Sequence, residues 1–151
     1  VAQYGIDMEL EEAKGIVQGF RSAYPKLYDW QTEEGNKTTK AVFTRYGRRR
    51  MLTGFNDKYT TRINTQVQGT AGDIAKIAIA MLWKEIKAAR VAEAFLISMV
   101  HDEIVLEVEE EFVEKWTAKL KYCMETAGGV ICKLVPILAE ASFGATWADA
   151  K

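Results

Sequence analysis

The chain has 151 residues, of which 48% are apolar and 27% are charged, with a formal net charge of −1. That length and apolar content suffice for one domain with a hydrophobic core, and nothing in the composition suggests disorder. No run reaches the roughly 18 apolar residues that a membrane-spanning helix needs, and no signal-peptide pattern is present, so we expect no membrane partner and a cytoplasmic location. Cys123 and Cys132 are too few for a disulfide framework, and with a single histidine they do not predict a zinc site.

Opposite charges are segregated along the chain. Residues 37–62 hold eight basic residues against one acid, whereas residues 102–125 hold eight acids against three lysines. The small net charge argues against a protein that coats nucleic acid, but this segregation would let one surface bind phosphates and another bind cations.

Apolar periodicity and turn residues predict helices that alternate with short hairpins. In chain order, the predicted elements are a helix from Glu9 to Tyr24 capped by Asp7, a helix over 25–41, a hairpin of 42–44 and 50–53 around Gly47, a helix over 64–89, a hairpin over 94–108, a helix over 110–126 stopped by Gly128-Gly129, and a strand over 134–143. The long helix is expected to bury an apolar face of Val67, Ile74, Ala78, Met81, Leu82 and Ile86. Helices packed on an antiparallel sheet give an α+β fold.

The tripeptide His101-Asp102-Glu103 separates two apolar runs of strand length, which predicts a tight hairpin turn with two carboxylates at the edge of a sheet. Carboxylate oxygens are the ligands that Mg²⁺ prefers, so the turn is a candidate metal site. The alternative is a polar hairpin tip without chemistry, because Asp is common in turns for local hydrogen-bonding reasons.

Two longer segments carry a resemblance to a known family. Residues 98–107, Ser-Met-Val-His-Asp-Glu-Ile-Val-Leu-Glu, resemble the third palm motif of family A DNA polymerases. Residues 63–76, Ile-Asn-Thr-Gln-Val-Gln-Gly-Thr-Ala-Gly-Asp-Ile-Ala-Lys, resemble the motif that precedes it in that family. Segments 20–27, 46–52 and 135–147 resemble further family signatures, so the resemblance runs from about Glu11 to Trp147.

The resemblance implies an incomplete polymerase palm within a single unit of residues 1–151, in which 1–62 are helices and a basic hairpin next to the fingers and 63–151 belong to the palm. The family's Asp-Tyr-Ser-x-x-Glu strand is absent from the sequence, as is its fingers helix with Arg, Lys and Tyr at fixed spacing. We therefore expect the carboxyl-terminal part of a polymerase, inactive without the missing part. The expected partners are a complementing N-terminal polymerase fragment, or a second copy of the chain through self-association.

The implied activity is template-directed DNA synthesis, with primer-template DNA and a dNTP as partners and two Mg²⁺ ions as cofactors. Asp102 is the expected direct metal ligand and Glu103 a weaker, outer contributor. His101 is expected to position the primer terminus. Without the resemblance, a lone imidazole of this kind is more often structural than catalytic.

The expected DNA contacts come from two segments. Asn64 and Gln68 are four residues apart, so a helix would place both amides on one face, where the resemblance implies contact with minor-groove acceptors. Arg48 and Arg49 are expected to bind phosphate oxygens. The family's arginine four residues before the asparagine falls on Thr60, which leaves Arg62 as its stand-in.

Each of these DNA contacts has a structural alternative. The arginines 48–50 could form a solvated turn. Asn64 and Gln68 could lie in an exposed helix start, with Thr70 and Asp73 as a capping-box-like pair for a later start.

Two other functions remain open. The chain could be a non-catalytic duplex-binding subunit that keeps the DNA contacts while its metal site is idle. It could also be a stand-alone metal nuclease, which would require Glu107 or Glu140 to approach Asp102 and supply further ligands.

Overall fold

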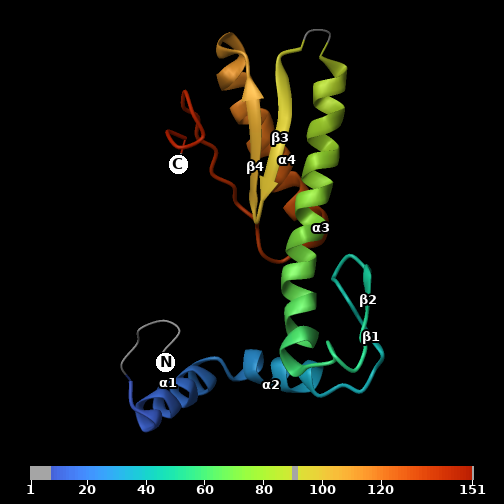
Figure 1. Ribbon diagram of the computed structural model, residues 1–151, viewed down its shortest axis with the longest axis vertical. Helices are drawn as coiled ribbons and strands as arrows, with labels where there is room; N and C mark the ends of the chain where they lie inside the picture. The colour runs from blue at the N-terminus through green and yellow to red at the C-terminus, as the bar shows by residue number, and fades with distance from the viewer. Residues whose placement is uncertain (1–7, 90–91, 151) are drawn as a thin grey trace. The chain divides into compact units, whose positions relative to one another are not determined.

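A computed structural model describes residues 8–89 and 92–150 (Figure 1). The elements are α1 (Leu10–Ala23), α2 (Pro25–Gly35), β1 (Ala41–Phe43), β2 (Arg49–Met51), α3 (Tyr59–Ala88), β3 (Ala94–Val100), β4 (Glu103–Val108), a 3-10 turn η1 (Glu110–Phe112) and α4 (Val113–Ile131). Strands β1 and β2 form one two-stranded sheet, and β3 and β4 form another, which confirms the predicted α+β class. No helix in the described ranges is long and apolar enough to cross a membrane.

The described residues fall into two compact units, both crossed by the long helix α3. Of the described residues, the first unit holds 8–42 and 51–64, and the second holds 43–50, 65–89 and 92–150.

In the first unit, α1 begins within one residue of its predicted start but buries none of its residues. Its predicted cap, Asp7, lies outside the described residues, and the observed N-cap Glu9 makes no side-chain capping bond. Helix α2 begins at Pro25 as predicted but ends at Gly35, six residues early. Gly35 is buried against Tyr59, and a Cβ there would lie 2.2 Å from a ring carbon of that tyrosine. This close packing explains the glycine at the end of α2.

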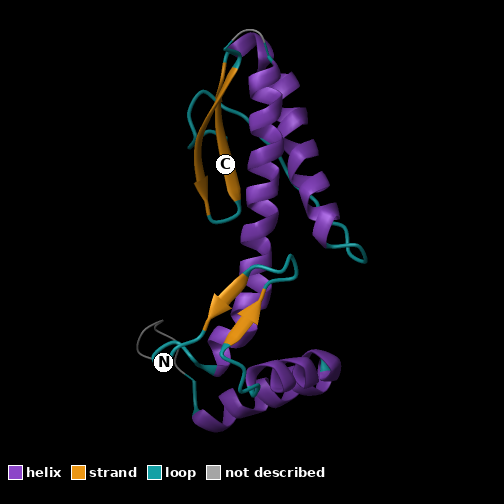
Figure 2. Cartoon of the chain, turned by 90° about the vertical axis from the view of Figure 1, so that its right-hand side faces the viewer, coloured by secondary structure: helices purple, strands orange, loops and turns teal. Residues whose placement is uncertain are grey.

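In the second unit, the β3–β4 hairpin packs with α3 and α4, which run beside it in both views (Figures 1 and 2). The core between them combines residues from all four elements: Ala78, Leu82, Ala94, Ile104, Trp116, Cys123 and Ala127. Trp116, Leu82 and Cys123 are its largest fully buried side chains. The predicted hairpin over 94–108 is confirmed, and it is held on one side by two helices.

The long helix begins at Tyr59, five residues before the predicted start. Of its predicted buried face, Ala78 and Leu82 are fully buried and Ile74, Met81 and Ile86 are partly buried. Val67 is 60% exposed, so the prediction was wrong for this residue. The packed elements of the hydrophobic core cover the C-terminal half of the apolar stripe and leave Val67 outside it.

Two predictions near the C-terminus were wrong. Helix α4 continues through Gly128-Gly129 to Ile131. Gly128 is buried there, and a Cβ on it would lie 2.4 Å from Ile137, so this glycine permits a close contact and does not end the helix. The predicted strand over 134–143 is absent, since the described residues there have no ladder partner. Instead, the N–H of Ala139 donates to Glu125 Oε1 at 3.2 Å, which attaches this segment to α4.

Candidate functional site

The acidic tripeptide lies at the tip of the β3–β4 hairpin. The antiparallel pairing ends with Val100 opposite Glu103, so His101 and Asp102 form a two-residue turn between the strands. His101 has φ 55°, a left-handed conformation that costs energy in a residue other than glycine. All three residues of the tripeptide are exposed, and the hairpin therefore presents the carboxylates of Asp102 and Glu103 to solvent.

The chemistry of this tip fits one part of a Mg²⁺ site. Asp102 and Glu103 offer the hard oxygen ligands that Mg²⁺ requires. Within residues 8–89 and 92–150, however, no group of three His, Cys, Asp or Glu side chains gathers in a metal-binding arrangement. Glu107 lies further along β4, opposite Phe95, and although Glu107 and Glu140 border the same hollow as Asp102, they do not complete such a group. The condition that the nuclease hypothesis requires is not met in the described part of the chain.

The basic hairpin docks onto α3 through Arg48. Its Nε donates to Asp73 Oδ1 at 2.6 Å, and its Nη2 donates to the backbone oxygen of Gly69 at 2.9 Å. A Cβ at Gly69 would lie 2.7 Å from a methyl carbon of Thr44, so the glycine permits this close approach. The Arg48 side chain is still 48% exposed, whereas that of Asp73 is 5% exposed.

Asp73 is held in its ionised form. Burial raises the pKa of this carboxyl, but hydrogen bonds from Thr44 and Arg48 and the positive charge of Arg48 outweigh burial, and its pKa lies below the ordinary value. The ion pair is therefore present at neutral pH.

The neighbouring arginines differ in their contacts. Arg49 is exposed, whereas Arg50 Nη1 donates to Thr65 Oγ1 at 3.2 Å. Two of the three arginines therefore bond to α3 rather than forming a turn that contacts only solvent.

Asn64 and Gln68 are both exposed residues of α3, one helical turn apart along the chain. The capping-box alternative was wrong, because Thr70 lies well inside the helix. Its hydroxyl donates to the backbone oxygen of Gln66 and accepts from the backbone N–H of Arg45.

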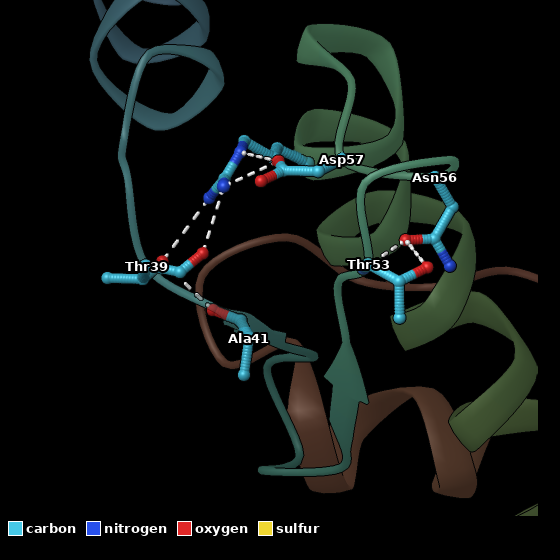
Figure 3. A network of polar contacts seen from close by, with 6 residues as sticks. Thr39, Ala41, Thr53, Asn56 and Asp57 are labelled. Carbon is cyan, nitrogen blue, oxygen red and sulfur yellow. Dashed lines mark hydrogen bonds and ion pairs between the residues drawn. The ribbon is translucent and has the colours of Figure 1, made fainter.

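Arg62 is buried in the first unit, with only 3% of its surface exposed. Its guanidinium bonds to Asp57 Oδ1, through Nε at 2.8 Å, and to the backbone oxygen of Thr39, through Nη2 at 2.9 Å. Figure 3 shows Thr39 and Asp57 in this network. The nearby loop is closed by a separate hydrogen bond, in which Asn56 Oδ1 accepts from the N–H of Thr53 at 2.7 Å. DNA contact by Arg62 stays a prediction, and these bonds favour a structural role.

Comparison with known proteins identifies the family of the chain. The model of DNA polymerase family A matches residues 2–149. The chain belongs to DNA polymerase family A. It is 32% identical to DNA polymerase I of Aquifex aeolicus over 95% of its own length and 25% of that protein. It is 33% identical to the thermostable DNA polymerase I of Thermus filiformis over 99% of its length and 18% of that protein.

A similar fold occurs in a solved polymerase domain. The POL domain of Pol1 from M. smegmatis, in complex with DNA primer-template and dNTP, superposes with a TM-score of 0.80 at 24% identity. That match covers 95% of this chain and 26% of the other, and at this identity it shows the fold alone. The chain thus spans about a quarter or less of the length of these relatives.

The sequence did not predict that two acids of this chain, Asp73 and Glu93, are buried and bonded. Asp73 was considered only as part of a helix cap, although an aspartate in a helix interior is unfavourable unless it has a partner. Glu93 bonds to Lys115 Nζ and accepts from the indole Nε1 of Trp116 at 3.0 Å. Its position just before a strand gives no comparable signal.

Proposed function

We propose that this chain takes part in template-directed DNA synthesis, the transfer of a nucleotide to a primer 3′-hydroxyl, as part of a family A DNA polymerase. The observation that carries this proposal is the family match over residues 2–149. The exposed carboxylates at the β3–β4 tip support it, since such an enzyme needs oxygen ligands on a rigid element. Primer-template DNA and a dNTP are the proposed partners, as they are bound in the structure of the M. smegmatis POL domain.

Within that enzyme, Asp102 would hold Mg²⁺ directly and Glu103 would contribute from further out. Bound Mg²⁺ supplies charge that stabilises the attacking and leaving oxygens of phosphoryl transfer. His101, in its left-handed conformation, would hold the turn and position the primer end. Asn64 and Gln68 would donate to minor-groove acceptors, which every Watson–Crick pair presents, and thereby test the geometry of the pair. Arg48 and Arg49 would bind backbone phosphates.

We propose that residues 1–62 lie next to the fingers and 63–151 in the palm of the assembled polymerase. The missing aspartate strand and nucleotide-binding helix would come from the complementing part. By this account the isolated chain does not polymerise, because Asp102 alone cannot hold two Mg²⁺ ions and the chain has no fingers set of Arg, Lys and Tyr.

Reconstitution tests the proposal. The purified chain should give template-dependent primer extension when it is mixed with a polymerase fragment that carries the missing strand and fingers helix. If a folded mixture binds the duplex but adds no nucleotide, the non-catalytic duplex-binding function is correct instead. If the mixture neither binds the duplex nor extends the primer, both candidate functions are excluded.

A further inference from the structure

The guanidinium of Arg48 has five N–H donors in a rigid fork. The carboxylate of Asp73 takes the Nε donor, and the backbone oxygen of Gly69 takes one donor of Nη2. Because nearly half of the side chain is exposed, the remaining donors can reach an anion in solvent. Arg48 is therefore held at its inner edge and open at its outer edge.

The groups that hold Arg48 are themselves fixed. Asp73 is buried and lies inside the long helix α3, so its carboxylate has little freedom to move. Thr44 accepts from the backbone N–H of Arg48 at 3.1 Å, which fixes the chain at the base of the arginine. A long flexible side chain is thus restrained both at its backbone and at its head.

We propose that Asp73 is a positioning residue that orients the guanidinium of Arg48 for contact with a phosphate of the DNA backbone. This inference rests on the proposed function, because it concerns how one of its DNA contacts is made. Orientation by Asp73 removes rotamer freedom before binding, which a free arginine would lose on binding. Asp73 itself touches no DNA in this account.

Positioning by Asp73 predicts a change in DNA affinity opposite in sign to the change expected from charge alone. Asp73→Asn removes a negative charge beside a phosphate site, so charge alone predicts tighter DNA binding. Loss of orientation predicts weaker binding instead. A merely structural role would lower the folded fraction by the same factor at every salt concentration and leave the salt dependence unchanged.

The experiment measures binding of the full chain to a short primer-template duplex between about 50 and 200 mM salt. Five variants are compared with the unchanged chain: Asp73→Asn, Arg48→Ala, Arg48→Lys, the double variant Asp73→Asn/Arg48→Ala, and Glu85→Gln as the matched control. Glu85 lies on the same helix and pairs with Lys119, so the control also removes one charge and one ion pair from α3. Thermal melting of each variant fixes a measuring temperature at which all are folded.

Asp73→Asn and Arg48→Ala should each weaken binding. Each should also reduce the slope of log binding constant against log salt concentration by the contribution of about one phosphate. The affinity deficit at 50 mM should therefore be about threefold larger than at 200 mM. Arg48→Lys should behave like Asp73→Asn, because lysine keeps the charge but lacks the fork. The double variant should be no weaker than Arg48→Ala, and Glu85→Gln should not weaken binding.

Other results would overturn the inference in distinguishable ways. If Arg48→Ala weakens binding but Asp73→Asn strengthens it or leaves the salt slope unchanged, Arg48 binds phosphate without Asp73 and only the positioning role is lost. If the unchanged chain does not bind the duplex, the proposed DNA contact fails and the positioning role fails with it.

Discussion

At the scale of single residues, the proposed function depends most on Asp102. Its place in a two-residue turn leaves the carboxylate exposed while the paired strands fix the backbone. In a reconstituted polymerase, Asp102→Asn should lower turnover by at least ~10³-fold, about 4 kcal/mol of transition-state stabilisation, because the amide keeps the shape but loses the charge that holds the metal. Single-turnover extension measures the loss, with Asp29→Asn on α2 as an acid-to-amide control. Near-normal incorporation by the Asp102 variant would remove its metal-ligand role.

Gln68 provides a second test at this scale. In the reconstituted polymerase, Gln68→Ala should slow extension most from a matched primer end that carries the minor-groove acceptor, and least from an end that lacks the acceptor, because there the bond is already absent. An uncharged hydrogen bond contributes about 0.5–1.5 kcal/mol net, so the expected effect is moderate. Extension rates from matched and modified primers, for the unchanged chain and the variant, give the comparison. If the variant extends every primer as the unchanged chain does, Gln68 does not contact the duplex.

At the scale of elements, two adjacent glycines of α4 make a matched pair. A Cβ at Gly128 would lie 2.4 Å from Ile137, whereas a Cβ at Gly129 would meet nothing within 4 Å. Gly128→Ala should destabilise the chain by about 1–3 kcal/mol through overpacking. Gly129→Ala should stabilise it by up to about 1 kcal/mol, because alanine is the better helix former. Urea unfolding measures both, and equal effects would mean that the segment containing Ile137 does not pack on α4.

The glycine pair also shows what the sequence could and could not predict. Apolar runs around the acidic tripeptide correctly predicted the β3–β4 hairpin, because strand length and turn chemistry are local properties. The stop at Gly128-Gly129 was wrong because this glycine serves a contact with Ile137, and a contact nine residues away leaves no local signal. The pairing of Arg48 with Asp73 likewise joins residues far apart in the sequence. Their local sequences predicted the elements that carry them but not the contact between them.

The buried Glu93 gives a pH-dependent prediction. The hydrogen bond from Lys115 lowers the pKa of Glu93 most strongly, and the bond from the Trp116 indole lowers it further. Burial raises the pKa, but by less. The pKa of Glu93 therefore lies below its ordinary value of 4.5. The unfolded chain then binds a proton more readily, so Glu93 stabilises the fold above pH 4.5, and the contribution is lost as the pH falls through the folded pKa.

Unfolding measurements across the acid range test this coupling. The stability difference between the unchanged chain and Glu93→Gln should be largest near neutral pH and should shrink below pH 4.5. In a Lys115→Met background the pH dependence of that difference should be much smaller, because the strongest stabilising partner is gone. A difference that stays constant with pH in the unchanged background would contradict the lowered pKa.

At the scale of the whole molecule, exposed apolar side chains are the dominant feature. In the first unit they lie on α1, and in the second on the outer face of the hairpin and the C-terminal segment: Leu10, Ile16, Phe20, Phe95, Ile97, Leu134, Leu138 and Phe143. Apolar patches of this kind mark protein contacts or cause association. They support the proposed packing against the rest of a polymerase and, without it, self-association.

We propose that this chain contributes an essential part of a DNA-synthesising site but does not form that site alone. Primer extension with four templates that differ only in the first unpaired base tests it most directly, using the chain alone, the complementing fragment alone and their mixture. Only the mixture should add a nucleotide, and its identity should follow the template base. Template-directed addition by the chain alone, or addition by the mixture regardless of the template base, would contradict the account.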